Sequence, residues 1–192
     1  MKRLIELANQ IKDKELREKT IKLLQEPEIS DSEIIYPAEK FDKIPAWVGA
    51  HHNYKGGQLE HTINVVKISL AIAKQFEEMY NAKINKDHLI SGALLHDIMK
   101  VFILKKSGKG WDLTGTLLDH ADFSACELYA RDFPEEVVHI VAAHGGDTGA
   151  AYPRTLEALI VYYADVIDAA GEGMIRGVPE LKLLLMPQSE EE

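Results

Sequence analysis

Cysteine is almost absent from this sequence, and long apolar runs are absent too. The single thiol, Cys126, excludes an internal disulfide framework and fits a reducing cytoplasm, where we expect the protein to be located. Its apolar surroundings predict a packed thiol rather than a nucleophile. No apolar stretch approaches the ~20 residues that a membrane span requires. The charged start, residues 1–6, has no apolar signal core. We therefore expect neither a membrane partner nor a secretory leader.

Basic residues are fewer than acidic ones, with 22 Lys and Arg against 31 Asp and Glu. The net charge of −9 argues against a broad basic face, so long duplex nucleic acid is not an expected partner. Metal ions would offset part of this negative charge locally. A small phosphorylated substrate that is drawn to metals is therefore compatible with the composition.

Strand-like alternation is nearly absent as well, and helical periodicity predominates, which predicts an all-α fold. Since no Ser/Gly/Pro-rich linker divides the 192 residues, we expect one domain. Residues 1–48 would form a helical and irregular N-terminal covering, residues 50–170 the core, and residues 187–192 an acidic tail. A basic, glycine-broken stretch predicts either a loop or one short hairpin near residues 101–115.

The apolar periodicity also predicts the individual helices. They cover about residues 2–25 (as one helix or two), the stretch after Gly56-Gly57 to about Tyr80, and about residues 86–102, 117–131, 135–144 and 153–170. Gly171 and Gly173 are expected to end the last long helix, and Pro179 to begin a short one through Met186.

The heptapeptide from Leu94 to Lys100, LLHDIMK, places polar groups where the surrounding pattern predicts core. At helical spacing His96 and Lys100 lie on one face, and Asp97 lies three residues before the lysine. A histidine and a carboxylate that are adjacent in sequence can converge on one metal ion at the edge of that face. The alternative is a polar turn in which Asp97 caps the next element and Lys100 lies in solvent. The heptapeptide alone leaves both interpretations open.

A second carboxylate, Asp165, lies in an apolar stretch, residues 158–167. A buried, unpaired carboxylate is costly, so it either becomes protonated or finds a cation, and a metal ion suits that role. Two other interpretations stay open: a salt bridge to Lys or Arg, or a solvent-facing stripe with Asp168 and Glu172. Further histidines fall near helix ends or on apolar faces: His61, His120, His139 and His144.

Imidazole and carboxylate donors from several helices describe a site for a divalent transition metal (Mn, Fe, Ni, Co or Zn) rather than a thiolate-bound structural zinc. Candidate ligands for a first ion are His61, His96, Asp97 and Asp165. A second ion needs more donors, and those available are His120 and His144, with Asp97 bridging. Two ions about 3.5–4 Å apart would activate a shared hydroxide and hold a phosphoryl group, which Lys100 would also contact.

In this order and in an all-α context, these residues resemble the HD superfamily of metal-dependent phosphohydrolases. The finer resemblance is to the HD domain of YhaM-type 3′→5′ exoribonucleases and their stand-alone relatives. It covers about residues 50–170, and its motifs are His51-His52-Asn53, Gly56-Gly57, Glu60-His61-Thr62, Gly92–Lys100, Gly115–His120, Ala143-His144-Gly145, Pro153, Glu157-Ala158, Asp165 and Asp168-Ala169. The resemblance implies the two ligand groups given above and catalytic roles for Asp97 and Lys100.

Three features depart from the family pattern. Met99 replaces the small glycine that usually precedes the lysine, which would crowd that turn. Ala143-His144 stands where the family often has two adjacent histidines, so one potential ligand or proton donor is missing. The nucleic-acid-binding domain of the exoribonucleases is also absent, so activity on RNA does not follow from the resemblance.

Substrate contacts are expected from His51 and His52, which precede a glycine turn where backbone can approach a phosphate. The alternative for one of the two is a capping or interhelical hydrogen bond. Lys55 is either substrate-facing or merely exposed. The run Lys105–Lys109 is either a solvated loop or a gate beside the site, and His88 and His139 are assigned no role.

We therefore expect a metal-dependent phosphohydrolase that cleaves a phosphomonoester or phosphodiester of nucleotide type through a metal-activated hydroxide. Its substrate would be a nucleotide or the 3′ end of a short oligonucleotide. Two alternatives stay open: an HD-fold diiron oxygenase, and a non-catalytic regulatory or binding module. The sequence leaves open the native metal, the number of ions (one or two) and the oligomeric state.

Overall fold

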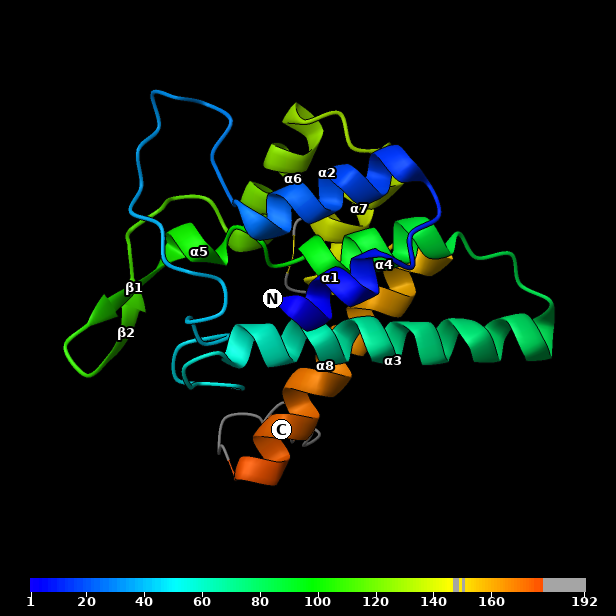
Figure 1. Cartoon of the computed structure of the whole chain (residues 1–192). Coiled ribbons are helices and arrows are strands. Elements are labelled where there is room, and N and C mark those ends of the chain that lie inside the picture. Colours follow the sequence, from blue (N-terminus) through cyan, green and yellow to red (C-terminus); the bar gives the residue numbers. More distant parts are fainter. Residues whose placement is uncertain (147–148, 150, 178–192) are drawn as a thin grey trace, which may run out of the picture.

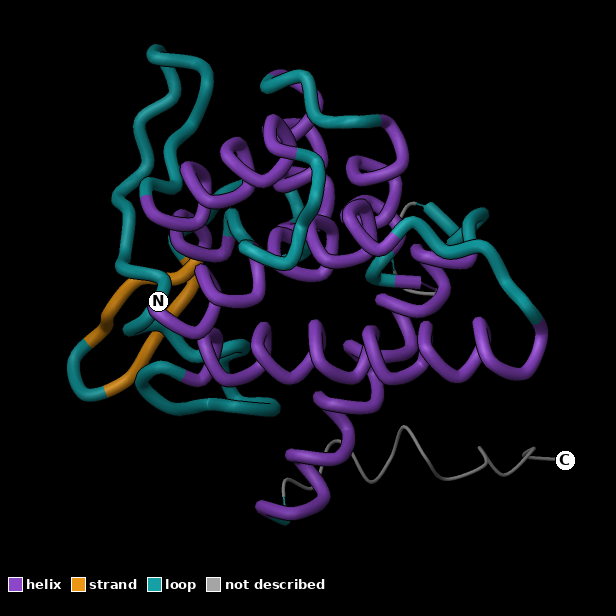
Figure 2. Tube along the Cα trace, turned by 45° about the vertical axis from the view of Figure 1, so that its right-hand side comes forward, coloured by secondary structure: helices purple, strands orange, loops and turns teal. Residues whose placement is uncertain are grey.

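A computed structural model describes residues 1–146, 149 and 151–177 of the chain. Helices dominate this part, and its one small sheet is a hairpin (Figures 1 and 2). In chain order the elements are α1 (Lys2–Ala8), α2 (Lys14–Gln25), α3 (Gly57–Tyr80), α4 (Lys86–Leu95), α5 (Lys100–Ile103), β1 (Leu104–Ser107), β2 (Gly110–Leu113), α6 (His120–Ala130), α7 (Glu135–Ala143) and α8 (Leu156–Arg176). The expected all-α class with one short hairpin is confirmed.

Helix α4 is the centre of the fold. Every residue from Leu89 to Leu95 is buried, which is typical of a helix that is surrounded by others. It packs against α1, α2, α3, α7 and α8, and Figure 1 shows it between α3 and the layer of α2 and α7. The polar pair His96-Asp97 follows directly, so the end of the most buried helix carries the motif.

Side-chain caps define where several of the helices begin. Asp13 accepts a hydrogen bond from the backbone N–H of Leu16, and Asp119 accepts one from Ala121. Thr155 does the same for Ala158 at the start of α8. Each cap satisfies a backbone donor that the first helical turn leaves unpaired.

Three local expectations are wrong. The helix expected to reach residue 102 is interrupted, because residues 96–99 form a turn between α4 and α5. Gly171 and Gly173 do not end α8, which continues to Arg176 and ends at Gly177, whose φ of +72° suits glycine. Cys126 is exposed on α6 and is not packed.

The N-terminal helices pack on the core, since α1 contacts α3 and α4, and α2 contacts α4. The segment from residue 26 to 56 contains no regular helix or strand and runs beside the hairpin in Figure 1. The expected acidic tail, 187–192, and the short helix expected at 179–186 lie outside the described residues. Among the described helices, none is both long enough and apolar enough to cross a membrane.

We predict that Gly92→Ala destabilises the protein. A β-carbon on Gly92 would lie 2.4 Å from Cγ2 of Ile140, so α4 and α7 would have to separate. Overpacking of this kind costs about 1–3 kcal/mol in the free energy of unfolding. The matched control is Gly171→Ala, where a β-carbon meets nothing within 4 Å and helix propensity favours alanine. Thermal or urea unfolding that showed equal stabilisation of both variants would contradict the α4–α7 packing.

Candidate metal centre

Five separate parts of the chain bring the candidate ligands together. His61 lies in the second turn of α3, and His96-Asp97 follows the last residue of α4. His120 is the first residue of α6, His144 follows the last residue of α7, and Asp165 lies in the middle of α8. Helices α4 and α7 end just before His96 and His144, and both of these histidines are buried at the helix ends.

The first group consists of His61, His96 and Asp165, whose ligand atoms all lie within 4.8 Å of one another. Nε2 of His61 lies 3.0 Å from Oδ1 of Asp165 and 3.3 Å from Nε2 of His96. Oδ2 of Asp97 lies 3.2 Å from Nε2 of His96 and 3.7 Å from Nε2 of His61. Four donor atoms therefore surround one small volume.

The second group consists of His120 and His144, which lie beside Oδ1, the other oxygen of the Asp97 carboxylate. Oδ1 of Asp97 is 3.4 Å from Nε2 of His120 and 3.6 Å from Nε2 of His144. The two imidazole nitrogens are 3.2 Å apart. Asp97 thus presents one oxygen to each histidine group, which is the arrangement of a carboxylate that bridges two ions.

Hydrogen bonds at Nδ1 fix which ring nitrogen faces the cluster. Nδ1 of His96 lies 2.8 Å from the carbonyl oxygen of Ala93, and Nδ1 of His144 lies 2.6 Å from that of Val141. A carbonyl only accepts, so both Nδ1 atoms carry a proton, and in the neutral form of each ring Nε2 presents a lone pair. These are the outer contacts that orient metal-binding imidazoles.

The donor set fits a divalent metal. Oδ1 of Asp97 is buried and has no hydrogen-bond partner among the described residues, and such an atom normally has one. The other donors are imidazole nitrogens and a carboxylate, which suit Mn, Fe, Co, Ni or Zn. The cluster can therefore hold a divalent metal at Asp97.

The charges within the cluster shift several pKa values. Burial opposes the charge of Asp97, but Lys100 and His96 outweigh it and hold the pKa of this carboxyl well below its usual range. Burial also opposes the charge of His61, yet hydrogen bonds to Asp165 and Asp168 raise the pKa of its imidazole to about 9. Both shifts reflect positive and negative groups that are held close together in a buried place.

Lys100 is buried, and its Nζ lies 2.6 Å from Oδ2 of Asp97. The ring of Trp47 covers the ammonium group at 5.2 Å from the ring centroid. The interpretation in which Lys100 lies in solvent and Asp97 caps a helix is therefore wrong. Met99 is fully buried with a φ of −81°, so its side chain is accommodated in this turn.

His51 and His52 lie against the first group. The ring centroids of His51 and His61 are 4.9 Å apart, and burial together with the charges of His61 and Lys100 lowers the pKa of His51 to about 3. His52 has a φ of +48°, and its backbone N–H donates to Oε2 of Glu172 at 2.8 Å.

Gly57 makes this position of His52 possible, since a β-carbon there would lie 2.0 Å from the His52 carbonyl oxygen. Lys55, by contrast, is exposed and lines a separate pocket described below.

Asp165 is less buried than expected, with 21% of its side chain exposed. The more buried carboxylate of α8 is Asp168, whose Oδ2 accepts a hydrogen bond from Nδ1 of His61 at 2.7 Å. The interpretation of Asp168 as part of a solvent-facing stripe is wrong. The three-residue spacing from Asp165 is the signal that both carboxylates share one face of α8.

One polar contact to Asp97 comes from a residue that no sequence pattern singles out. Gln58 is fully buried, and its amide donates to Oδ2 of Asp97 at 3.1 Å. His139, to which no role is assigned, accepts a hydrogen bond from the backbone N–H of Arg154 and so joins α7 to the segment before α8.

Comparisons with known proteins agree with the resemblance inferred from the motifs. The HD domain family matches residues 59–170. A dihydroneopterin 2′,3′-cyclic phosphate phosphodiesterase from Methanocaldococcus jannaschii is 46% identical over 88% of this chain and 69% of its own length. The 3′-5′ exoribonucleases YhaM of Geobacillus sp. and Bacillus subtilis are 27% and 28% identical, and the chain spans about half of their length. No solved structure matches significantly.

We predict that Asp168→Ala weakens metal binding although Asp168 is not a candidate ligand. Without this acceptor, the His61 ring loses its fixed orientation, and loss of such a partner typically lowers metal affinity about 10–100-fold. Titration with Mn(II), followed by elemental analysis of the protein, measures the effect. Asp31→Ala, an exposed position in the segment before α3, is the control. Unchanged affinity in Asp168→Ala would mean that His61 does not depend on this contact.

Proposed function

The chain belongs to the HD domain family of metal-dependent phosphohydrolases, and we propose that it hydrolyses a cyclic phosphodiester of nucleotide type. The observation that carries the proposal is the position of Asp97, whose two carboxylate oxygens face two separate histidine groups. The extensive identity with a 2′,3′-cyclic phosphate phosphodiesterase supports the choice of a cyclic diester.

In the proposed reaction, the oxygen of a water molecule forms a new bond to phosphorus. One of the two bonds from phosphorus to the substrate's vicinal oxygens breaks, and that oxygen takes up a proton as it leaves. The product carries a phosphomonoester beside a free hydroxyl group. A divalent ion at the site would polarise a phosphoryl oxygen and lower the pKa of a bound water.

We assign the ligand roles as the geometry groups them. His61, His96, Asp97 and Asp165 would hold one ion, and Asp97, His120 and His144 a second. The native metal would be one of Mn, Fe, Co, Ni and Zn.

The remaining roles belong to residues beside the ligands. Lys100 lies within reach of a phosphate at Asp97 and would stabilise negative charge on it. His51 and His52 would contact the substrate, because they lie against His61 and at the edge of the cluster. His52 would be kept in place by Glu172.

The proposal includes the domain organisation of the chain. Residues 50–170 would form the HD core and residues 1–48 would cover it within a single domain, which the packing of α1 and α2 on α4 supports. A cytoplasmic location is part of the same proposal, based on the single thiol.

The proposed function predicts metal-dependent cleavage of adenosine 2′,3′-cyclic phosphate or dihydroneopterin 2′,3′-cyclic phosphate, with no oxygen requirement. Chelation should abolish turnover, and Mn(II) or Fe(II) should restore it under anaerobic conditions. Asp97→Asn should lower kcat by more than about 100-fold. Loss of a residue that only contacts a metal ligand typically costs about 10–100-fold, and Asp97 is itself a candidate ligand. Asp31→Asn is the matched control. Full turnover in Asp97→Asn, or a requirement for oxygen, would contradict the proposal.

A further inference from the structure

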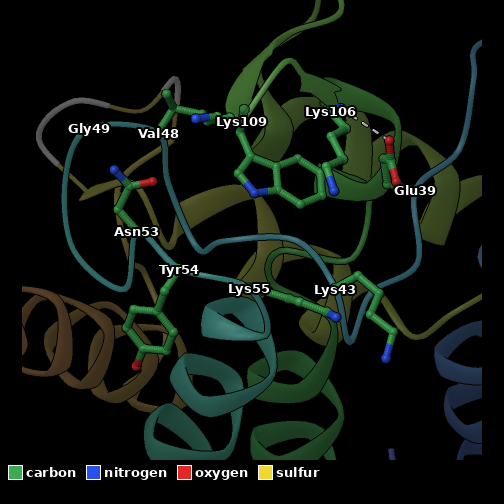
Figure 3. Close-up of a pocket in the computed structure, with 11 residues that line it drawn as sticks. Glu39, Lys43, Val48, Gly49, Asn53, Tyr54, Lys55, Lys106 and Lys109 are labelled. Carbon is green, nitrogen blue, oxygen red and sulfur yellow. Dashed lines mark hydrogen bonds between the residues drawn. The ribbon is translucent and has the colours of Figure 1, made fainter.

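A pocket of about 690 Å³ lies between the segment before α3 and the β1–β2 hairpin (Figure 3). This volume is typical of sites for small molecules. The residues that line it are Glu39, Lys43, Val48, Gly49, Asn53, Tyr54, Lys55, Lys106, Lys109, Gly110 and Trp111. None of these is a candidate metal ligand, and we call this feature the lysine pocket.

Positive charge is concentrated in the lysine pocket although the chain as a whole carries a net charge of −9. Four lysines and one carboxylate line it, and the carboxylate, Glu39, accepts a hydrogen bond from the backbone N–H of Lys106 at 3.1 Å. Lys43 pairs with Asp42 at 3.0 Å. Among the described residues, Lys55, Lys106 and Lys109 have no carboxylate within 4.0 Å. Three ammonium groups therefore remain available to an anion.

The register of the hairpin determines which of its side chains face the pocket. Lys106 pairs with Trp111 across the two strands, so both lie on the same face, while Lys105 pairs with Asp112 on the opposite face. Figure 3 shows Lys106 reaching from the hairpin toward the segment that carries Lys43 and Lys55. The half-buried indole of Trp111 adds a planar surface to this charged wall.

The lysine pocket adjoins the metal centre through a shared segment, residues 47–55. Trp47 lies beside His120, with ring centroids 5.5 Å apart, and His51 lies beside His61. Asn53 and Lys55, a few residues further on, line the pocket. One stretch of chain thus both contacts the cluster and forms a wall of the pocket.

We infer that the lysine pocket binds a second phosphate group of the substrate, one that is not cleaved. This inference rests on the proposed function and narrows the substrate class to nucleotides with a further phosphate, such as a 5′-phosphorylated cyclic nucleotide or a short oligonucleotide end. Ammonium groups donate charge-assisted hydrogen bonds to phosphate oxygens. The face of Trp111 can stack on an attached ring.

The test compares adenosine 2′,3′-cyclic phosphate with the same molecule phosphorylated at the 5′ position, in the wild-type protein and in a double variant, Lys106→Ala with Lys109→Ala. We expect the wild type to favour the 5′-phosphorylated substrate about tenfold in kcat/KM, as two partly exposed ion pairs allow. In the double variant this ratio should fall to about one. Lys105→Ala, which removes the same charge from the opposite face of the hairpin, should keep the ratio.

A wild-type ratio near one, or a double variant that loses activity equally on both substrates, would overturn the inference while leaving the proposed function intact. If neither substrate is cleaved, the proposed function fails, and binding still tests the pocket. Calorimetry should then show that adenosine 3′,5′-bisphosphate binds more tightly than adenosine 3′-phosphate to the wild type and not to the double variant. Equal affinities of the two ligands for the wild type would refute the pocket's role.

Discussion

The candidate ligands surround one buried carboxylate, that of Asp97. Asp97 is almost wholly inaccessible, and a charged carboxylate in such a place requires charged or hydrogen-bonding partners. The protein supplies Lys100 at 2.6 Å and four imidazoles within 3.7 Å of its two oxygens. Oδ1 still has no hydrogen-bond partner among the described residues. A divalent ion beside Oδ1 would give this oxygen a partner and would accept the lone pairs of neutral His120 and His144.

The helical framework explains how the cluster is held. Helix α4 is buried at every residue from Leu89 to Leu95, and its end at Leu95 places His96-Asp97 deep in the molecule. Helices α3 and α8 pack against each other and bring His61 to Asp165 and Asp168. The close approach of α7 to α4, which Gly92 permits, puts His144 near the same carboxylate. The packing of these core helices therefore also determines the geometry of the site.

Much of this could be predicted from sequence, because the candidate ligands are polar residues at positions where apolar periodicity predicts core. The spacing of Asp168 from Asp165 indicates a shared helix face, but it could not show that this face is buried, since such a pair suits a solvated face equally well. Gln58 carries no local pattern, and only the tertiary fold places its amide on Asp97. The end of α4 at Leu95 is not predicted from the sequence, because apolar residues recur beyond it as far as Ile103. The lysine pocket depends on the pairing of the hairpin with a distant, irregular segment, which no local rule specifies.

We expect the Asp97 carboxylate to bridge two metal positions. Anomalous diffraction from crystals grown with Mn(II) tests it directly. Two manganese peaks are expected on opposite sides of Asp97, one also contacting His61, His96 and Asp165 and the other also contacting His120 and His144. Manganese bound only elsewhere, with neither oxygen of Asp97 in contact with an ion, would contradict it.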